Sequence, residues 1–142
     1  MDGSPGLGQG CLNVRRLNSG EISEEAIQKT VIQWVRSHPY FKGKEGLVLH
    51  FPSEGARSPV FGKKLKDMGF RAGIADLLIA MPRRGYGGAW LELKSKKGKL
   101  SPAQKEFLDN MQQQNYFTAV CYSIEGAIEM IEWYCFQPNQ LS

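Results

Sequence analysis

With 142 residues, of which 42% are hydrophobic, the chain is long enough for one domain with its own core, and no apolar run approaches the roughly 20 residues of a membrane span. Its net charge of +4 is uneven, because the segment from Arg57 to Lys105 holds 12 lysines and arginines against 3 acidic residues, while the remainder is acidic. A basic middle segment favours a polyanionic partner, and a start without the charged and apolar regions of a signal peptide favours a cytoplasmic protein.

The first part of the chain combines a polar segment with a well-marked helix. Residues 1–20 are rich in glycine, serine and asparagine, and we expect a flexible N-terminal arm before a single domain over residues 21–142. A helix is expected to begin after Ser23, whose hydroxyl can cap it, with Glu24 and Glu25 at its positive end. Pro39 would end this helix, and its buried stripe would consist of the residues Ile27, Val31, Trp34 and Val35.

A short strand and a second helix are expected next. The apolar run Leu47–Phe51 predicts the strand, and a loop over residues 52–57 follows it. The helix would extend from about residue 58 to residue 68, because Gly69 is a typical residue to follow a helix end.

Two further apolar runs predict a β-hairpin. They cover residues 74–80 and 89–94, and the turn-rich segment 83–88 between them is typical of a hairpin loop. The basic turn 96–99 follows the second strand.

The last third begins with a helix start whose signals are complete. Ser101 is a suitable N-cap, Pro102 occupies the first helical position, and Gln104 has the spacing of a capping box. After this helix, which would end near residue 115, a strand over residues 117–122 and a helix over residues 123–134 are expected. The order of elements predicts an α/β fold with a mixed central β-sheet flanked by helices.

Charged residues interrupt both strands of the predicted hairpin. Asp76 lies near the start of the first strand, and Glu92 and Lys94 lie two residues apart on the second, so strand alternation points both to one face. Such residues are rarely buried unless they are paired or bound to a metal. Two carboxylates and an ammonium converging on a sheet edge therefore predict a hydrolytic site with Mg²⁺, or Mn²⁺ in its place, in which the lysine would orient or deprotonate a water.

The spacing of these three residues resembles the signature of the PD-(D/E)XK nuclease superfamily. Longer stretches resemble one of its branches, the VRR-NUC domain, in its stand-alone phage and bacterial type, and the likeness extends over about residues 22–135. It differs at Ala75, where the family usually has proline, and at Ser53, where asparagine is common. The stretches that carry it are residues 73–76, 90–94 and 98–104, with the strand and helix from Val120 to Ile131.

The resemblance implies a set of metal ligands and a supporting residue. The ligands would be Asp76, Glu92, the main-chain carbonyl of Leu93 and a glutamate of the first helix. Glu24 is favoured over Glu25 for that glutamate, because it has the spacing of the buried stripe, although both residues could serve only the helix dipole. Gln104 matches a glutamine that would support the water or the lysine, and its alternative role is to complete the capping box.

The resemblance and the charge distribution together imply a metal-dependent DNA endonuclease. Because stand-alone relatives resemble homodimers that cut four-way junctions, the expected activity is like that of a Holliday-junction resolvase on branched DNA. Alternatives are a flap or other structure-specific nuclease, a sequence-specific restriction enzyme, and a non-catalytic DNA-binding subunit. Candidate phosphate contacts are Arg57, Lys63, Lys96, Lys97 and Lys99.

Overall fold

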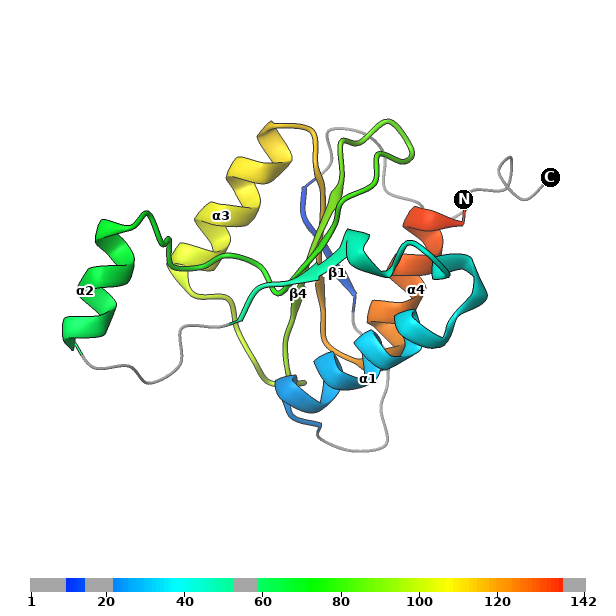
Figure 1. Ribbon diagram of the computed structural model, residues 1–142, viewed down its shortest axis with the longest axis horizontal. Helices are drawn as coiled ribbons and strands as arrows, with labels where there is room; N and C mark the ends of the chain where they lie inside the picture. Colours follow the sequence, from blue (N-terminus) through cyan, green and yellow to red (C-terminus); the bar gives the residue numbers. More distant parts are fainter. Residues whose placement is uncertain (1–9, 15–21, 53–58, 137–142) are drawn as a thin grey trace.

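The computed structural model describes residues 10–14, 22–52 and 59–136, which form one mixed five-stranded sheet with helices on both faces (Figure 1). The strand order is β1-β5-β4-β3-β2, so β4 lies in the middle. The strands are β1 (Leu12–Val14), β2 (Val48–His50), β3 (Leu77–Ile79), β4 (Ala89–Leu93) and β5 (Phe117–Cys121). The α-helices are α1 (Glu24–Ser37), α2 (Pro59–Asp67), α3 (Pro102–Gln113) and α4 (Ile124–Cys135). Two short 3₁₀ helices, η1 (Pro39–Phe41) and η2 (Glu45–Leu47), connect α1 to β2.

The pairing of β4 reflects the two kinds of connection on either side of it. The turn over residues 83–88 joins β3 to β4 as an antiparallel hairpin, as expected from its glycines. The helix α3 provides the longer connection that a parallel pair needs, and β5 accordingly runs parallel to β4. The prediction of an α/β fold with a mixed sheet is confirmed.

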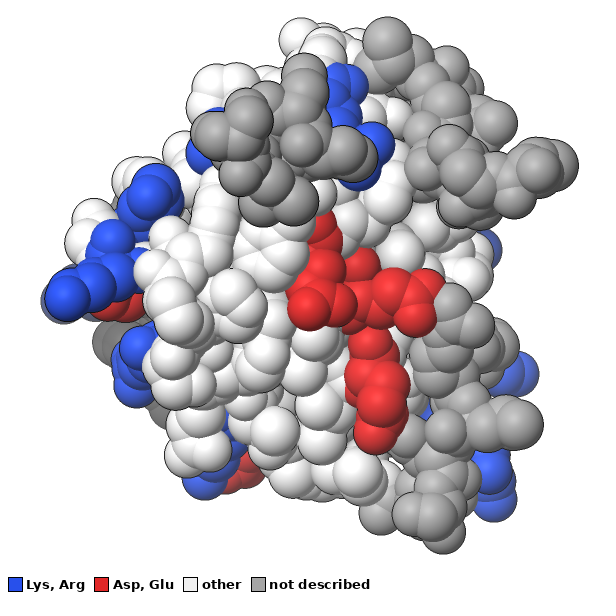
Figure 2. Space-filling model, turned by 90° about the vertical axis from the view of Figure 1, so that its right-hand side faces the viewer, with Lys and Arg blue, Asp and Glu red and all other residues white. Residues whose placement is uncertain are grey.

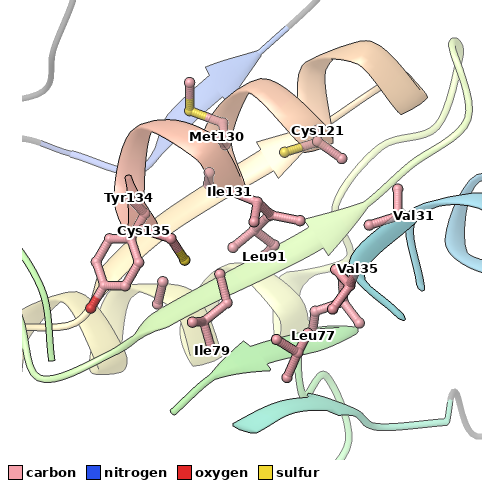
Figure 3. Close-up of a cluster of buried hydrophobic side chains, with 14 of the residues drawn as sticks. Val31, Val35, Leu77, Ile79, Leu91, Cys121, Met130, Ile131, Tyr134 and Cys135 are labelled. Atoms are coloured by element: carbon pink, nitrogen blue, oxygen red, sulfur yellow. The ribbon is translucent and has the colours of Figure 1, made fainter. Parts of the chain in front are cut away.

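Alternation along β4 separates two cores. Leu91 and Leu93 face the helices α1 and α4, where they join a large apolar cluster that includes Val31, Ile131 and the fully buried Tyr134. Figure 3 shows this cluster, with side chains of α1 and α4 directed toward those of β3 and β4. On the other face, Trp90, Val120 and Tyr122 pack with Leu108 of α3 in a smaller cluster, and Glu92 and Lys94 point to this same side by alternation.

The N-terminal segment differs from the expected flexible arm. Leu12–Val14 forms β1, which pairs in parallel with β5 and places Val14 in the large core, while residues 1–9 and 15–21 lie outside the described residues. Three residues are too few to show a period in the sequence, and their partner strand lies about a hundred residues further along the chain. In the described part of the chain, no helix has the length and apolar character needed to cross a membrane.

Candidate functional site

Asp76 and Glu92 lie opposite each other where the neighbouring strands β3 and β4 pair. The β3–β4 register aligns Leu77 with Leu91, so Asp76, immediately before β3, lies opposite Glu92. The main-chain N–H of Leu93 donates to Asp76 Oδ2 at 2.7 Å, which fixes the aspartate beside β4. The two carboxylates therefore meet at the ends of central strands and not, as the sequence suggested, at an edge of the sheet.

Glu92 and Lys94 are buried together. Their exposed fractions are 2% and 7%, and Lys94 Nζ lies 3.6 Å from Glu92 Oε2. The same oxygen accepts a hydrogen bond of 3.0 Å from Gln104 Nε2, whereas the buried Oε1 has no hydrogen-bond partner among the described residues. A buried carboxylate oxygen without a donor is costly, so this atom indicates a position for a further positive or polar group.

Gln104 completes the capping box that its sequence position suggested, and its side chain also reaches the site. Its Oε1 accepts from the Ser101 N–H at 2.8 Å while Ser101 Oγ accepts from the Gln104 N–H at 3.2 Å, which is a complete capping box. Its remaining amide group is then directed to Glu92. The first turn of α3 and the central carboxylate are thus connected by a single side chain.

Gly73 holds the segment before Asp76 against the same turn of α3. Its φ of +85° lies in the left-handed region that favours glycine. A Cβ at this position would lie 2.5 Å from the main-chain carbon of Ala103 and 2.8 Å from the nitrogen of Gln104. This close contact packs the segment before Asp76 against the backbone of Ala103 and Gln104, and neither charge nor periodicity in the sequence indicated it.

The structure distinguishes between the two glutamates at the start of α1. Glu24 lines the same cavity as Asp76 and Glu92, and its Oε2 lies 3.5 Å from the main-chain nitrogen of Ser95. Glu25 instead forms an ion pair of 2.8 Å with Lys29 on the exposed side of the helix. Glu24 is therefore the glutamate of α1 that is placed to act at the site.

The electrostatics of the site follow from burial and from the crowding of carboxylates. Burial, together with the nearby Asp76, raises the pKa of Glu92 to about 8, against the lowering effect of Lys94. Burial also raises the pKa of Asp76, although the Leu93 N–H favours the charged form. Because the pKa values of both carboxyl groups are raised, the metal-free pair of Asp76 and Glu92 favours a bound proton, and a cation that binds there would have to displace it.

Replacing Glu92 with glutamine should stabilise the metal-free protein relative to the wild type. This difference in stability should increase as the pH rises. The glutamate has a higher pKa in the folded state than its usual value of 4.5, so wild-type stability falls between that value and about 8 and stays reduced above it. Glutamine has no such charge to bury, and the gain above about pH 8 should reach a few kcal/mol. Urea unfolding in EDTA at about pH 5 and about pH 9 measures the difference.

Glu132→Gln, on the exposed side of α4, is the matched control because it removes the same charge without removing a buried one. A wild-type protein and a Glu92→Gln variant with the same pH dependence of unfolding would show that Glu92 is not a strained buried carboxylate.

The donor set is suited to Mg²⁺. The histidine, cysteine, aspartate and glutamate side chains of the described residues form no group of three or more that could hold a metal ion by themselves. Mg²⁺ needs fewer, since it is usually bound through one or two carboxylates and keeps several of its waters. Asp76 and the unpartnered Oε1 of Glu92 offer such oxygens. The Leu93 carbonyl lies on the Asp76 side of β4, because the N–H and C=O of one strand residue point the same way.

The carboxylates line a cavity of about 690 Å³ together with residues of α2 and α3. Its walls come from segments far apart in the sequence, and they include Phe51, Leu65, Phe70 and Arg71. No sequence pattern indicated these wall residues, since each is an ordinary apolar or basic residue until the fold brings it to the site.

The candidate phosphate contacts are divided in position. Lys96, Lys97 and Lys99 belong to the exposed turn after β4, where Gly98 lies beside Lys94 and Glu24 Oε2. Lys63 is on α2, and its ammonium pairs with Asp67 at 2.9 Å. Arg57 lies outside the described residues.

Comparison with known proteins gives one family. Residues 22–125 match a family described as the VRR-NUC domain. A solved structure of a VRR-NUC domain protein is 29% identical in sequence, with a TM-score of 0.70, and the similarity covers 81% of this chain and 89% of the other. None of the curated proteins compared with the chain matches it.

Proposed function

The chain belongs to the VRR-NUC domain family, and on this premise we propose that it is a Mg²⁺-dependent endonuclease that hydrolyses phosphodiester bonds in DNA, with Mn²⁺ as a substitute. The observation that carries the proposal is the buried Glu92, opposite Asp76 and next to Lys94, with one oxygen lacking a partner. In a metal-free protein this arrangement keeps one carboxyl oxygen of Glu92 out of water without a hydrogen-bond partner, which is costly. A divalent cation held there would compensate that oxygen and would supply the charge stabilisation that phosphodiester hydrolysis needs.

Each residue of the site would have a distinct part in the reaction. Asp76, Glu92 and the Leu93 carbonyl would hold the ion, with Glu24 at its outer side, and the ion would activate a water and offset charge on the pentacovalent transition state. Lys94 would position that water and polarise it, since its ammonium is buried beside Glu92. Gln104 would keep Glu92 in place through its hydrogen bond.

The charge distribution supports an approach of DNA from the cavity side. Figure 2 shows acidic side chains gathered on the right-hand side of Figure 1, where α4 lies. That helix has glutamates at helical spacing, Glu125, Glu129 and Glu132, and the sequence contains no lysine or arginine after Lys105. The basic turn after β4 lies instead beside the carboxylates, where it would contact phosphates.

We further propose that the protein acts as a homodimer on branched DNA, as a Holliday-junction resolvase does. Two copies related by a twofold axis would present two sites to opposing strands of a symmetric four-way junction. Incubation with labelled four-way junction, flap and linear duplex, each with Mg²⁺, Mn²⁺ or EDTA, should give metal-dependent paired nicks in the junction, and light scattering should give the mass of a dimer. A monomer that cuts flaps faster than junctions would refute the resolvase proposal, and binding without cleavage of any substrate would refute the nuclease proposal itself.

Glu24→Gln should impair cleavage far more than Glu25→Gln. The first change removes a negative charge from the cavity with little change of shape, and we expect roughly a tenfold to hundredfold loss of metal-dependent rate, the range for outer groups of a metal site. The second change breaks only the exposed pair with Lys29 and should leave both the cleavage rate and the stability close to those of the wild type. Initial rates over a Mg²⁺ titration measure both effects. The reverse order would show that Glu25, and not Glu24, acts at the site.

A further inference from the structure

The cavity above the carboxylates has an apolar wall that hydrolysis does not require. Phe51, Leu65, Phe70 and Ile74 line it together with Asp76 and Glu92. Holding a cation and a water needs polar atoms, and a phosphate is bound by cations and N–H groups. The apolar wall is therefore suited to a different part of the same substrate.

Phe70 is placed to offer an aromatic face to this cavity. Gly69, with φ of +99°, reverses the chain after α2, and the Phe70 N–H returns to the carbonyl of Leu65 at 2.9 Å. The Phe51 ring is already packed against Trp90, with 5.3 Å between ring centroids. By contrast, no aromatic ring in the described part of the chain packs against Phe70, which is only half-buried.

Two basic residues lie near Phe70 in a region that continues beyond the site and that also includes Glu106. Phe70, Arg71 and Ala72 also line a second cavity, of about 700 Å³, between the end of α2 and α3. Lys66 lies at this second cavity, and both Lys66 and Arg71 are exposed. An aromatic ring between cations is the combination by which proteins hold unpaired nucleic-acid strands, with bases stacked on rings and phosphates near the charges.

We propose that Phe70 and the adjoining apolar wall form a subsite for an unstacked nucleobase of the nucleotide next to the scissile phosphate. This inference rests on the proposed nuclease function and specifies its substrate as DNA with an unpaired or flipped nucleotide at the cut. A volume of about 690 Å³ lies within the range of ligand-binding pockets. Stacking on Phe70 does not select among bases, because every base has a π-face. The subsite would therefore distinguish unpaired from paired nucleotides and not one base sequence from another.

Binding measured without cleavage tests this subsite. Fluorescence anisotropy in EDTA would compare a labelled single strand of about 12 nucleotides with the same strand carrying abasic residues, at low salt. The variants are Phe70→Ala, which removes the ring, and Phe70→Trp, which keeps one. Met68→Ala is the control, because Met68 is 73% exposed in the same segment and does not line either cavity.

Loss of the ring should weaken binding of the normal strand by roughly 5- to 150-fold, the equivalent of about 1–3 kcal/mol per stacked base. Phe70→Trp and Met68→Ala should bind as the wild type does, and the abasic strand should bind wild type and Phe70→Ala equally. A loss by Phe70→Ala that is the same on both strands would overturn the subsite, because it would reflect a general change of the fold. Equal binding of both strands by wild type would also overturn it.

The test separates the two proposals. Binding in EDTA does not depend on catalysis, so a protein that discriminates normal from abasic strands but cuts no DNA would retain the base subsite and lose the nuclease function. A protein that cuts junctions but binds normal and abasic strands equally would retain the nuclease function and lose the base subsite.

Discussion

Replacing Asp76 with asparagine or Lys94 with methionine should reduce DNA cleavage by roughly a hundredfold to a thousandfold or more, with the fold retained. Asparagine has nearly the shape of aspartate and can still accept from the Leu93 N–H, but it lacks the charge that a divalent ion requires. Methionine keeps the apolar stem of the buried lysine and removes the ammonium that lies 3.6 Å from Glu92 Oε2. Single-turnover rates on a labelled junction with Mg²⁺ measure the loss.

Matched controls lie on α3. Asp109→Asn and Lys105→Met make the same chemical changes at exposed positions outside the site, and both should cleave at close to the wild-type rate. Circular dichroism would show that all four variants fold, and anisotropy in EDTA would show that the two site variants still bind DNA. Near wild-type cleavage by either site variant would remove that residue from the mechanism.

Gly73→Ala should destabilise the protein by about 2–4 kcal/mol and abolish most of its cleavage activity. The new Cβ would lie 2.6 Å from the Ala103 carbonyl oxygen, so the segment before Asp76 must move away from α3. The left-handed φ of +85° adds backbone strain to this collision. Urea unfolding at constant pH gives the change in the free energy of unfolding. The cleavage rate of the folded variant shows whether Asp76 still occupies its place in the site.

Gly69→Ala separates strain from collision. Gly69 has a similar φ of +99°, but no atom lies within 4 Å of the place where its Cβ would be. Its substitution should therefore cost only about 1–2 kcal/mol, the strain alone. If the two alanine variants were equally stable, the contact between Gly73 and α3 would not be a constraint on the site.

The features predicted from the sequence are those that depend on neighbouring residues. The cap at Ser23, the hairpin turn before Ala89 and the capping box at Ser101 are each specified within a few residues, and all three are present. The placement of Glu24 also followed from local spacing, because the apolar stripe of α1 determines which side of the helix faces the sheet.

The features that could not be predicted depend on contacts between distant segments. β1 is defined by its pairing with β5, and no pattern within Leu12–Val14 distinguishes it from a loop. Phe70 becomes a candidate for substrate contact only because the fold places the chain after α2 at the cavity that Asp76 and Glu92 also line. For Gln104, the capping box was visible in the sequence, but its second hydrogen bond reaches a strand that precedes the helix by a long turn.

The two hydrogen bonds of Gln104 connect the local unfolding of α3 to the state of the site. When the first turn of α3 opens, Ser101 loses its acceptor and Glu92 loses its donor in one event. Local opening of this kind exposes main-chain amides to exchange with solvent deuterium. The exchange rate of the Ser101 amide should therefore report how firmly Glu92 is held, and it should slow whenever a bound group orders that carboxylate.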